Sequence, residues 1–165
     1  MRKYQLSRGW RNNNPLNIRR GEEWQGLVAK EKRTDGAFCQ FLNMTWGFRA
    51  AARCLRSYYQ LFCQQGKTWD VENIIRRWAP ASENNTEAYI RRVLELMGRD
   101  RGQTRLAPPH TKPGRLQLAL LVAAMTCVET GCPLDAVPVD NLNAGFILAG
   151  LGDPSLKVGG VKEIS

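Results

Sequence analysis

The stretch RLQLALLVAAMTCVET, residues 115–130, decides the fold. From Leu116 to Val128 it contains no charged residue, and a helix that is apolar around its whole circumference is buried on all sides. The run is too short to span a bilayer. We therefore expect a central helix over residues 115–130, ended by Gly131, with the rest of the chain packed around it.

Helical periodicity recurs on both sides of this segment. From Thr45, a candidate N-cap, apolar residues at steps of three and four predict a helix that ends at Gly66. Further helices are predicted from about Thr68 to Pro80, from a capping box of Asn84 and Glu87 to Gly98, and onward from a cap at Asp140.

These elements predict a mainly α (α+β) fold with a small β-hairpin within residues 26–41. The length of 165 residues fits a single domain, 1–165, that buries roughly 70% of the surface of its unfolded chain. Residues 99–114 hold three prolines and two glycines, so we expect an exposed linker between two halves of the domain. Residues 152–165 are expected to form a tail.

The chain is strongly basic, with 24 Lys and Arg against 15 Asp and Glu and a net charge of +9. Such a surface attracts polyanions, which include nucleic acid, an anionic membrane surface and an acidic cell-wall polymer. Arg49, Arg53 and Arg56 share the polar face of the 45–66 helix, where they suit nucleic-acid phosphates, although an ordinary solvated face explains them more simply.

Several kinds of chemistry are excluded by what the sequence lacks. It has one histidine and five cysteines with no CxxC pair, so we expect no metal site and no disulfide scaffold. His110 stands alone in the proline-rich segment, without the partners that a nucleophilic serine or cysteine needs. No glycine-rich phosphate loop occurs, so no cofactor is expected. Carboxylates are then the natural catalytic groups.

One carboxylate stands apart from the others. Glu129 is the acidic residue of the apolar 115–130 helix and lies in its last turn. Burial and the negative end of a helix dipole both favour the protonated form of a carboxylic acid, which is the form that a general acid needs. The more common alternative is a side chain that points into solvent where the helix emerges.

Near the N-terminus, the stretch RGWRNNNPLNIRR, residues 8–20, places asparagines between arginines. The amides of Asn13, Asn14 and Asn17 both donate and accept hydrogen bonds, which suits a neutral ligand rich in hydroxyl and acetamido groups. Equally, they can close a turn through bonds to the backbone. Arg19 beside them suits carboxylates on the same ligand.

Five segments resemble motifs of the glucosaminidase and lytic transglycosylase branches of the lysozyme-like superfamily: Glu129-Thr130-Gly131, Asn13-Asn14-Pro15-Leu16-Asn17-Ile18-Arg19, Trp24-Gln25-Gly26, Phe38-Cys39-Gln40-Phe41 and the 45–63 helix that ends in Tyr58-Tyr59. In that superfamily the glutamate precedes the asparagine turn, whereas here it follows. The resemblance therefore implies a lysozyme-like domain that is circularly permuted, a change that proteins tolerate because domain termini often lie close together.

A second resemblance needs no permutation. The segments RNNNPLNIRRGEEWQG, DGAFCQF and RWAPASENNTEAYI, within residues 8–98, resemble phage and prophage proteins described as virion structural or muralytic proteins.

Together the resemblances imply a peptidoglycan-degrading protein whose partners are the glycan strands of peptidoglycan and phage virion components. Glu129 would be the general acid of a glycoside hydrolase or lytic transglycosylase. Asn13, Asn14, Asn17 and Arg19 would bind the glycan, and Trp24, Trp78 and Tyr89 are candidates to stack on sugar rings, although a place in the core is more common for aromatic residues. Candidate second carboxylates are Glu83, Asp35 and Glu22.

The alternatives are an inactive virion or wall-binding protein on the same fold, an enzyme that cuts the peptide cross-links, and a basic nucleic-acid-binding helical protein. The first residues lack the apolar segment of a signal peptide, so we expect synthesis in the cytoplasm. Action at the cell wall would then need delivery by a phage or holin-type route.

Overall fold

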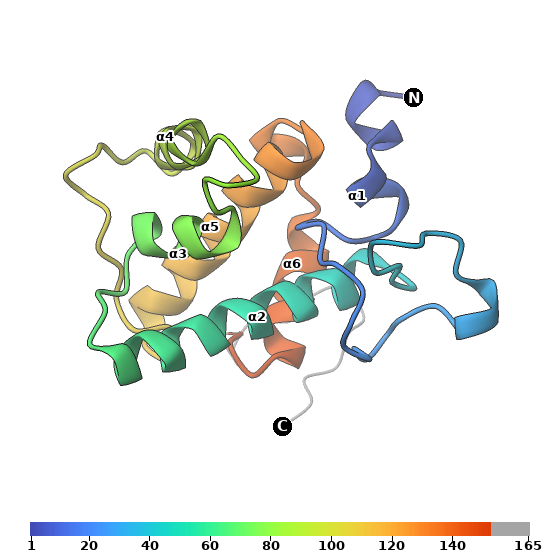
Figure 1. Ribbon diagram of the computed structural model, residues 1–165, viewed down its shortest axis with the longest axis horizontal. Helices are drawn as coiled ribbons and strands as arrows, with labels where there is room; N and C mark the ends of the chain where they lie inside the picture. Colours follow the sequence, from blue (N-terminus) through green and yellow to red (C-terminus); the bar gives the residue numbers. More distant parts are fainter. Residues whose placement is uncertain (153–165) are drawn as a thin grey trace.

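The computed structural model describes residues 1–152, and its chain is mainly helical, as predicted (Figure 1). Most of the predicted tail, residues 152–165, lies outside the described residues. The α-helices and 3₁₀ turns of the described part are η1 (Lys3–Leu6), α1 (Arg8–Arg11), η2 (Lys30–Lys32), α2 (Met44–Gln65), α3 (Val71–Trp78), α4 (Thr86–Leu96), α5 (Lys112–Thr130), η3 (Leu134–Ala136) and α6 (Val139–Leu148).

The predicted central helix is α5. It begins at Lys112, earlier than expected, because the Thr111 hydroxyl accepts a hydrogen bond from the Gly114 N–H at 3.1 Å and Pro113 fits the first turn. It ends at Thr130, where Gly131 takes a left-handed conformation at φ 78°. Burial on all sides is wrong for its first half, since Leu116 is 60% exposed, but holds from residue 121 to residue 127.

The longest helix, α2, runs across the molecule beside α6 (Figure 1). Its N-cap is Asn43, whose side chain accepts from the Trp46 N–H, and not Thr45, which lies buried inside the first turn. Its predicted end is confirmed by Gly66 at φ 64°. The two helices pack closely, because a Cβ placed on Gly145 of α6 would lie 2.7 Å from the Thr45 carbonyl oxygen.

Helices α3 and α4 lie on the same side of the molecule as the C-terminal half of α5 (Figure 1). The Asp70 side chain caps α3, and Asn85 caps α4 through the Ala88 N–H. The expected capping box of Asn84 and Glu87 is therefore wrong. Glu87 instead forms ion pairs with the arginines at positions 76 and 101. Asp140 lies in the first turn of α6 rather than at its cap.

The loops between α1 and α2 extend from one end of the helical body (Figure 1). The hairpin expected within residues 26–41 is not confirmed, because the segment contains a single isolated antiparallel bridge, Leu27 with Phe41, and a second bridge joins Phe38 to Arg19 outside it. The 3₁₀ turn η2 and the bends at residues 36 and 37 lie between Leu27 and Phe41, so no continuous ladder of hydrogen bonds forms. The loops are instead held by side-chain amides.

The segment between α4 and α5 runs beside the start of α3. The Leu106 N–H donates to the Trp69 carbonyl oxygen at 3.1 Å, and the Val71 N–H donates to Thr104 at 2.9 Å. Residues 100–103 are exposed, whereas Leu106 and Pro109 are buried. Among residues 1–152, no helix combines the length and the hydropathy needed to cross a membrane.

Candidate functional site

Glu129 lies in the last turn of α5, half-buried, and three donors from distant parts of the chain converge on its carboxylate. The Tyr89 hydroxyl of α4 donates to Oε2 at 2.8 Å, and the Trp78 indole N–H of α3 donates to the same oxygen at 3.3 Å. The Asn17 amide donates to Oε1 at 3.0 Å across a sequence separation of 112 residues. The carboxylate is thus fixed from three sides.

Tyr89 keeps its proton in this arrangement. Its ring is buried in the core, and both burial and the neighbouring Glu129 carboxylate raise the pKa of its hydroxyl well above the usual value. A phenol that stays protonated near neutral pH donates a hydrogen bond. Tyr89 therefore fixes the position of the glutamate rather than competing with it for a proton.

Asn17 owes its orientation to the turn that carries it. Its backbone lies in the left-handed region at φ 53°, which asparagine tolerates better than most residues. A Cβ placed on Gly9 would lie 2.9 Å from Asn17 Oδ1, so the amide oxygen faces α1. The amide nitrogen is then the group turned toward Glu129.

The Glu129 side chain opens into a groove of about 360 Å³ that is open to solvent. One wall comes from the turn after α1, another from the middle of α2, and a third from the end of α3 and the loop that follows it. The lining residues are Leu16, Asn17, Ile18, Arg19, Phe38, Cys54, Tyr58, Trp78, Ala79, Glu83, Asn84 and Glu129.

Sequence comparison matches this chain to a phage protein. It is 41% identical over 146 residues to Protein P5 of Pseudoalteromonas phage PM2, and the aligned region covers 86% of this chain and 81% of that protein. The chain belongs to the Protein P5 family. It matches no protein-family model. The resemblance to phage proteins that the sequence indicated is thereby confirmed, and the name of this relative states no activity.

In this member of the Protein P5 family, Asn13 and Asn14 serve the turn and do not line the groove. Asn14 is fully buried, donates to the carbonyl oxygens of Ile18 and Cys39 at 2.9 and 3.0 Å, and accepts from the Ile18 N–H. Asn13 donates to the Phe41 carbonyl oxygen at 3.1 Å. Asn13 and Asn14 therefore close the turn through bonds to the backbone, which was the alternative to ligand binding. Asn17, in contrast, lines the groove.

Asp35 is an anchor for the loops and lies outside the groove. Its carboxylate binds the Arg8 guanidinium through two contacts of 2.7 Å and accepts from the N–H groups of Ala37 and Phe38 and from the Asn12 amide. These contacts, led by Arg8, hold the pKa of the carboxyl far below its usual range. A carboxylate so fully engaged has no free oxygen to act as a base.

Two further predicted residues lie beside the groove rather than in it. Trp24 packs against a small core cluster that contains Ile18 and Phe41. Together with Glu22 it lines a neighbouring cavity over α2. Of the three candidate second carboxylates, Glu83 is the one that lines the groove with Glu129.

Sequence reasoning did not assign Phe38, Cys54, Tyr58 or Asn84 to the site. Tyr58 and Cys54 lie one turn apart on α2, partly buried and packed against the core. Helical periodicity alone cannot distinguish such groove residues from core residues. Cys54 is no nucleophile, because burial raises the pKa of its thiol to about 12. Within residues 1–152, no group of three or more His, Cys, Asp and Glu side chains is placed to hold a metal ion.

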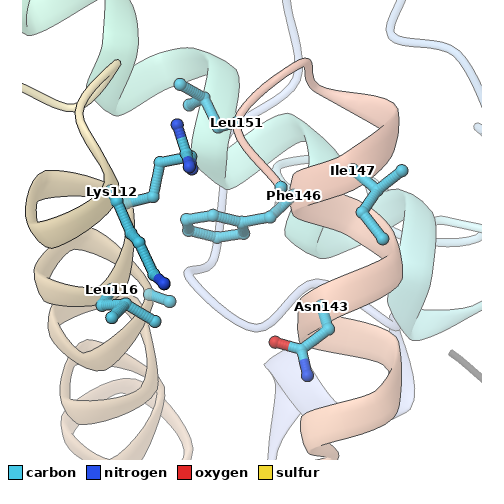
Figure 2. Close-up of a pocket in the computed structure, with 9 residues that line it drawn as sticks. Lys112, Leu116, Asn143, Phe146, Ile147 and Leu151 are labelled. Carbon is cyan, nitrogen blue, oxygen red and sulfur yellow. The ribbon is translucent and has the colours of Figure 1, made fainter. Parts of the chain in front are cut away.

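A separate, small apolar cavity of about 40 Å³ lies at the other end of α5. Figure 2 shows Phe146 of α6 pointing toward α5, where Lys112 and Leu116 face it. Leu116 and Glu129 are 13 positions apart on one helix, which places this cavity ~20 Å from the carboxylate. It does not belong to the candidate site.

Proposed function

We propose that this chain degrades peptidoglycan, with the groove holding a glycan strand and Glu129 acting as the general acid. In its protonated form Glu129 donates a proton to the glycosidic oxygen between two amino sugars as the bond from that oxygen to the sugar carbon breaks. The observation that carries the proposal is a carboxyl group at the end of a buried helix, held by three donors in an open groove.

The lysozyme-like, permuted origin of the domain is supported by one contact. The resemblance requires the asparagine turn and the glutamate to form a single site although their order in the chain is reversed. Asn17 and Glu129 meet at 3.0 Å. A circular permutation of a lysozyme-like domain would produce this juxtaposition.

The chemistry of the groove suits an amino-sugar polymer. The amide of Asn84 matches acetamido and hydroxyl groups, which both donate and accept hydrogen bonds, whereas the Asn17 amide holds Glu129 in place. The rings of Tyr58 and Trp78 offer faces or edges to the apolar side of a sugar. Arg19, exposed at the rim, suits a carboxylate on the same strand.

Glu83 is the candidate for the second carboxylate of a hydrolase. Hydrolases of this kind use a pair of carboxylates, whose separation decides whether the second acts as a nucleophile or activates a water. Glu83 lies in the loop between α3 and α4, exposed and without an ion-pair partner among residues 1–152. If Glu83 plays no part, the single acid Glu129 corresponds to a lytic transglycosylase.

The test is the loss of turbidity of purified peptidoglycan sacculi, followed by mass analysis of the released fragments. The proteins compared are the wild type, Glu129→Gln, Glu83→Gln and the control Glu95→Gln, an exposed position on α4 that pairs with Arg92. We expect clearing by the wild type and the control, none by Glu129→Gln, and fragments that end in sugars. Fragments that end in cut peptides would show instead that the protein cleaves the peptide cross-links.

The phage relative is compatible with a second candidate, a virion component that binds the wall without cutting it. Under that alternative no protein clears the sacculi, yet the wild type and Glu129→Gln both pellet with them. If no protein pellets and all bind DNA with a steep salt dependence, the basic nucleic-acid binder replaces both proposals.

A further inference from the structure

The groove around Glu129 does not end at α2. Cys54 lines the groove and also lines a second cavity of about 270 Å³ that extends over the outer face of the helix. The two cavities therefore adjoin at this side chain. The second cavity is lined by Glu22, Trp24, Arg53, Cys54, Arg56, Ser57 and Gln60.

The chemistry changes from one cavity to the next. Amide, aromatic and carboxyl groups line the groove, whereas α2 supplies guanidinium, hydroxyl and amide groups to the second cavity. We call Arg53, Arg56, Ser57 and Gln60 the arginine shelf. Arg53 precedes Cys54 and Ser57 precedes Tyr58, so the shelf lies next to the groove wall on the surface of one helix.

The cations of this face lack acidic partners. Among residues 1–152, no carboxylate lies within 4.0 Å of Arg49, Arg53 or Arg56, whereas the arginines at 76 and 101 share the acids of α3 and α4. Burial, and then the like charges of the neighbouring Arg53 and Arg56, lower the pKa of Arg49. A negative group would relieve this repulsion.

Arg53 is the member best placed to bind such a group. Arg56 already donates to the Ala149 carbonyl oxygen at 3.0 Å, which ties it to the end of α6. Arg53 makes no hydrogen bond to another residue among those described, and its side chain is half-buried beside Cys54. Glu22 lines the same cavity and opposes an anion there.

We propose that the arginine shelf binds carboxylates of the peptide stems that branch from the glycan strand in the groove. This inference rests on the proposed function and narrows its substrate to peptide-bearing strands. A guanidinium binds a carboxylate through two parallel hydrogen bonds, which a hydroxyl-rich sugar cannot reproduce. Naked glycan, such as stem-free strands or chitin oligomers, fills the groove and leaves the shelf unused.

The test compares soluble glycan strands that keep their peptide stems with the same strands after an amidase has removed them. Binding is measured in the Glu129→Gln background so that the strands stay intact. The variants are Arg53→Gln, Arg53→Lys, Glu22→Gln and the control Arg91→Gln, which removes the same charge as Arg53→Gln from an exposed position on α4.

We expect Arg53→Gln to weaken binding of stem-bearing strands about tenfold and to leave stem-free strands unchanged. Arg53→Lys should lose less affinity than Arg53→Gln, because an ammonium keeps the positive charge but cannot form two parallel hydrogen bonds to a carboxylate. Glu22→Gln should tighten binding of stem-bearing strands. Arg91→Gln should change neither.

Equal binding of both kinds of strand, unaffected by Arg53→Gln, would overturn the shelf and leave the proposed function standing. Failure of the wild type to cleave and of the Glu129→Gln variant to bind either strand would overturn the proposed function itself. Loss of DNA binding in Arg53→Gln, with strand binding unchanged, would assign the shelf to nucleic acid and overturn the inference.

Discussion

Three side chains of different chemistry donate to one carboxylate at Glu129, and each donor comes from a different part of the fold. The amide donates to one carboxylate oxygen, and the indole and the phenol donate to the other. Because both oxygens are held, the orientation of the carboxyl plane is fixed. Fixed orientation matters for a general acid, because proton transfer requires the donor within hydrogen-bond reach of the leaving oxygen.

The contribution of Tyr89 is testable by removing its hydroxyl alone. Tyr89→Phe keeps the buried ring and deletes the 2.8 Å hydrogen bond that holds the Glu129 carboxyl group. We expect the rate of sacculus clearing to fall at least about tenfold, with an unchanged far-UV circular dichroism spectrum. Tyr59→Phe, which alters a tyrosine packed on Trp69, is the control and should clear normally.

Asp35 makes a different prediction, about stability and pH. Its carboxyl pKa is held below the unfolded value, so its contribution to folding is full above about pH 4 and declines as the pH falls toward the folded pKa. Asp35→Asn should destabilise the protein by about 2 kcal/mol at pH 7. In urea denaturation the gap between the two proteins should narrow at pH 3. A constant gap would contradict the role of the charge.

At the level of single residues, the sequence allowed Glu129, Asn17, Trp78 and Tyr89 to be picked as candidates, and the structure brings these four into contact. It could not separate Asn17 from its neighbours Asn13 and Asn14, because all three share one chemistry and differ only in burial. The same holds for carboxylates, since nothing in the sequence distinguishes the engaged Asp35 from the exposed Glu83.

At the scale of helices, ends were more predictable than beginnings. Gly66 and Gly131 follow α2 and α5 in left-handed conformations that few residues other than glycine adopt. A glycine after a helical pattern therefore marks the end of the helix. At N-termini several neighbouring residues can cap, and tertiary contacts choose among them. Thr45, for example, accepts a hydrogen bond from Asn141 of α6 instead of capping α2.

Packing between α2 and α6 decides whether Gly145→Ala stabilises or destabilises the protein. In an isolated helix, Gly145→Ala would stabilise by up to about 1 kcal/mol. Here the added methyl group would lie 2.7 Å from backbone atoms of α2, which cannot move aside as a side chain would. We expect a net loss of about 1–3 kcal/mol in the free energy of unfolding, measured by chemical denaturation.

The control for this prediction is Gly36→Ala, because a Cβ at Gly36 meets nothing within 4 Å. Its stability should stay within about 0.5 kcal/mol of the wild type. Equal effects of the two substitutions would mean that α6 is not seated on α2 as described.

At the scale of the whole molecule, the basic charge predicts how wall binding responds to salt. The net charge of +9 favours association with an anionic polymer, and salt screens it, with a Debye length of about 10 Å at 0.1 M. We expect pelleting with sacculi to weaken several-fold between low and moderate salt. Binding of neutral chitin oligomers should change little, and an equal fall for both ligands would contradict this explanation.

The 112-residue separation of Asn17 and Glu129 also determines when the site can form during synthesis. While the chain is being synthesised, the asparagine turn emerges early, and its partner glutamate arrives only after α2, α3 and α4 have been made. Domains fold as units during synthesis, and contacts between distant residues form late. A ribosome-bound or prematurely stopped chain that lacks α5 therefore holds one half of the site without the other, and the groove is not finished until α5 has been made.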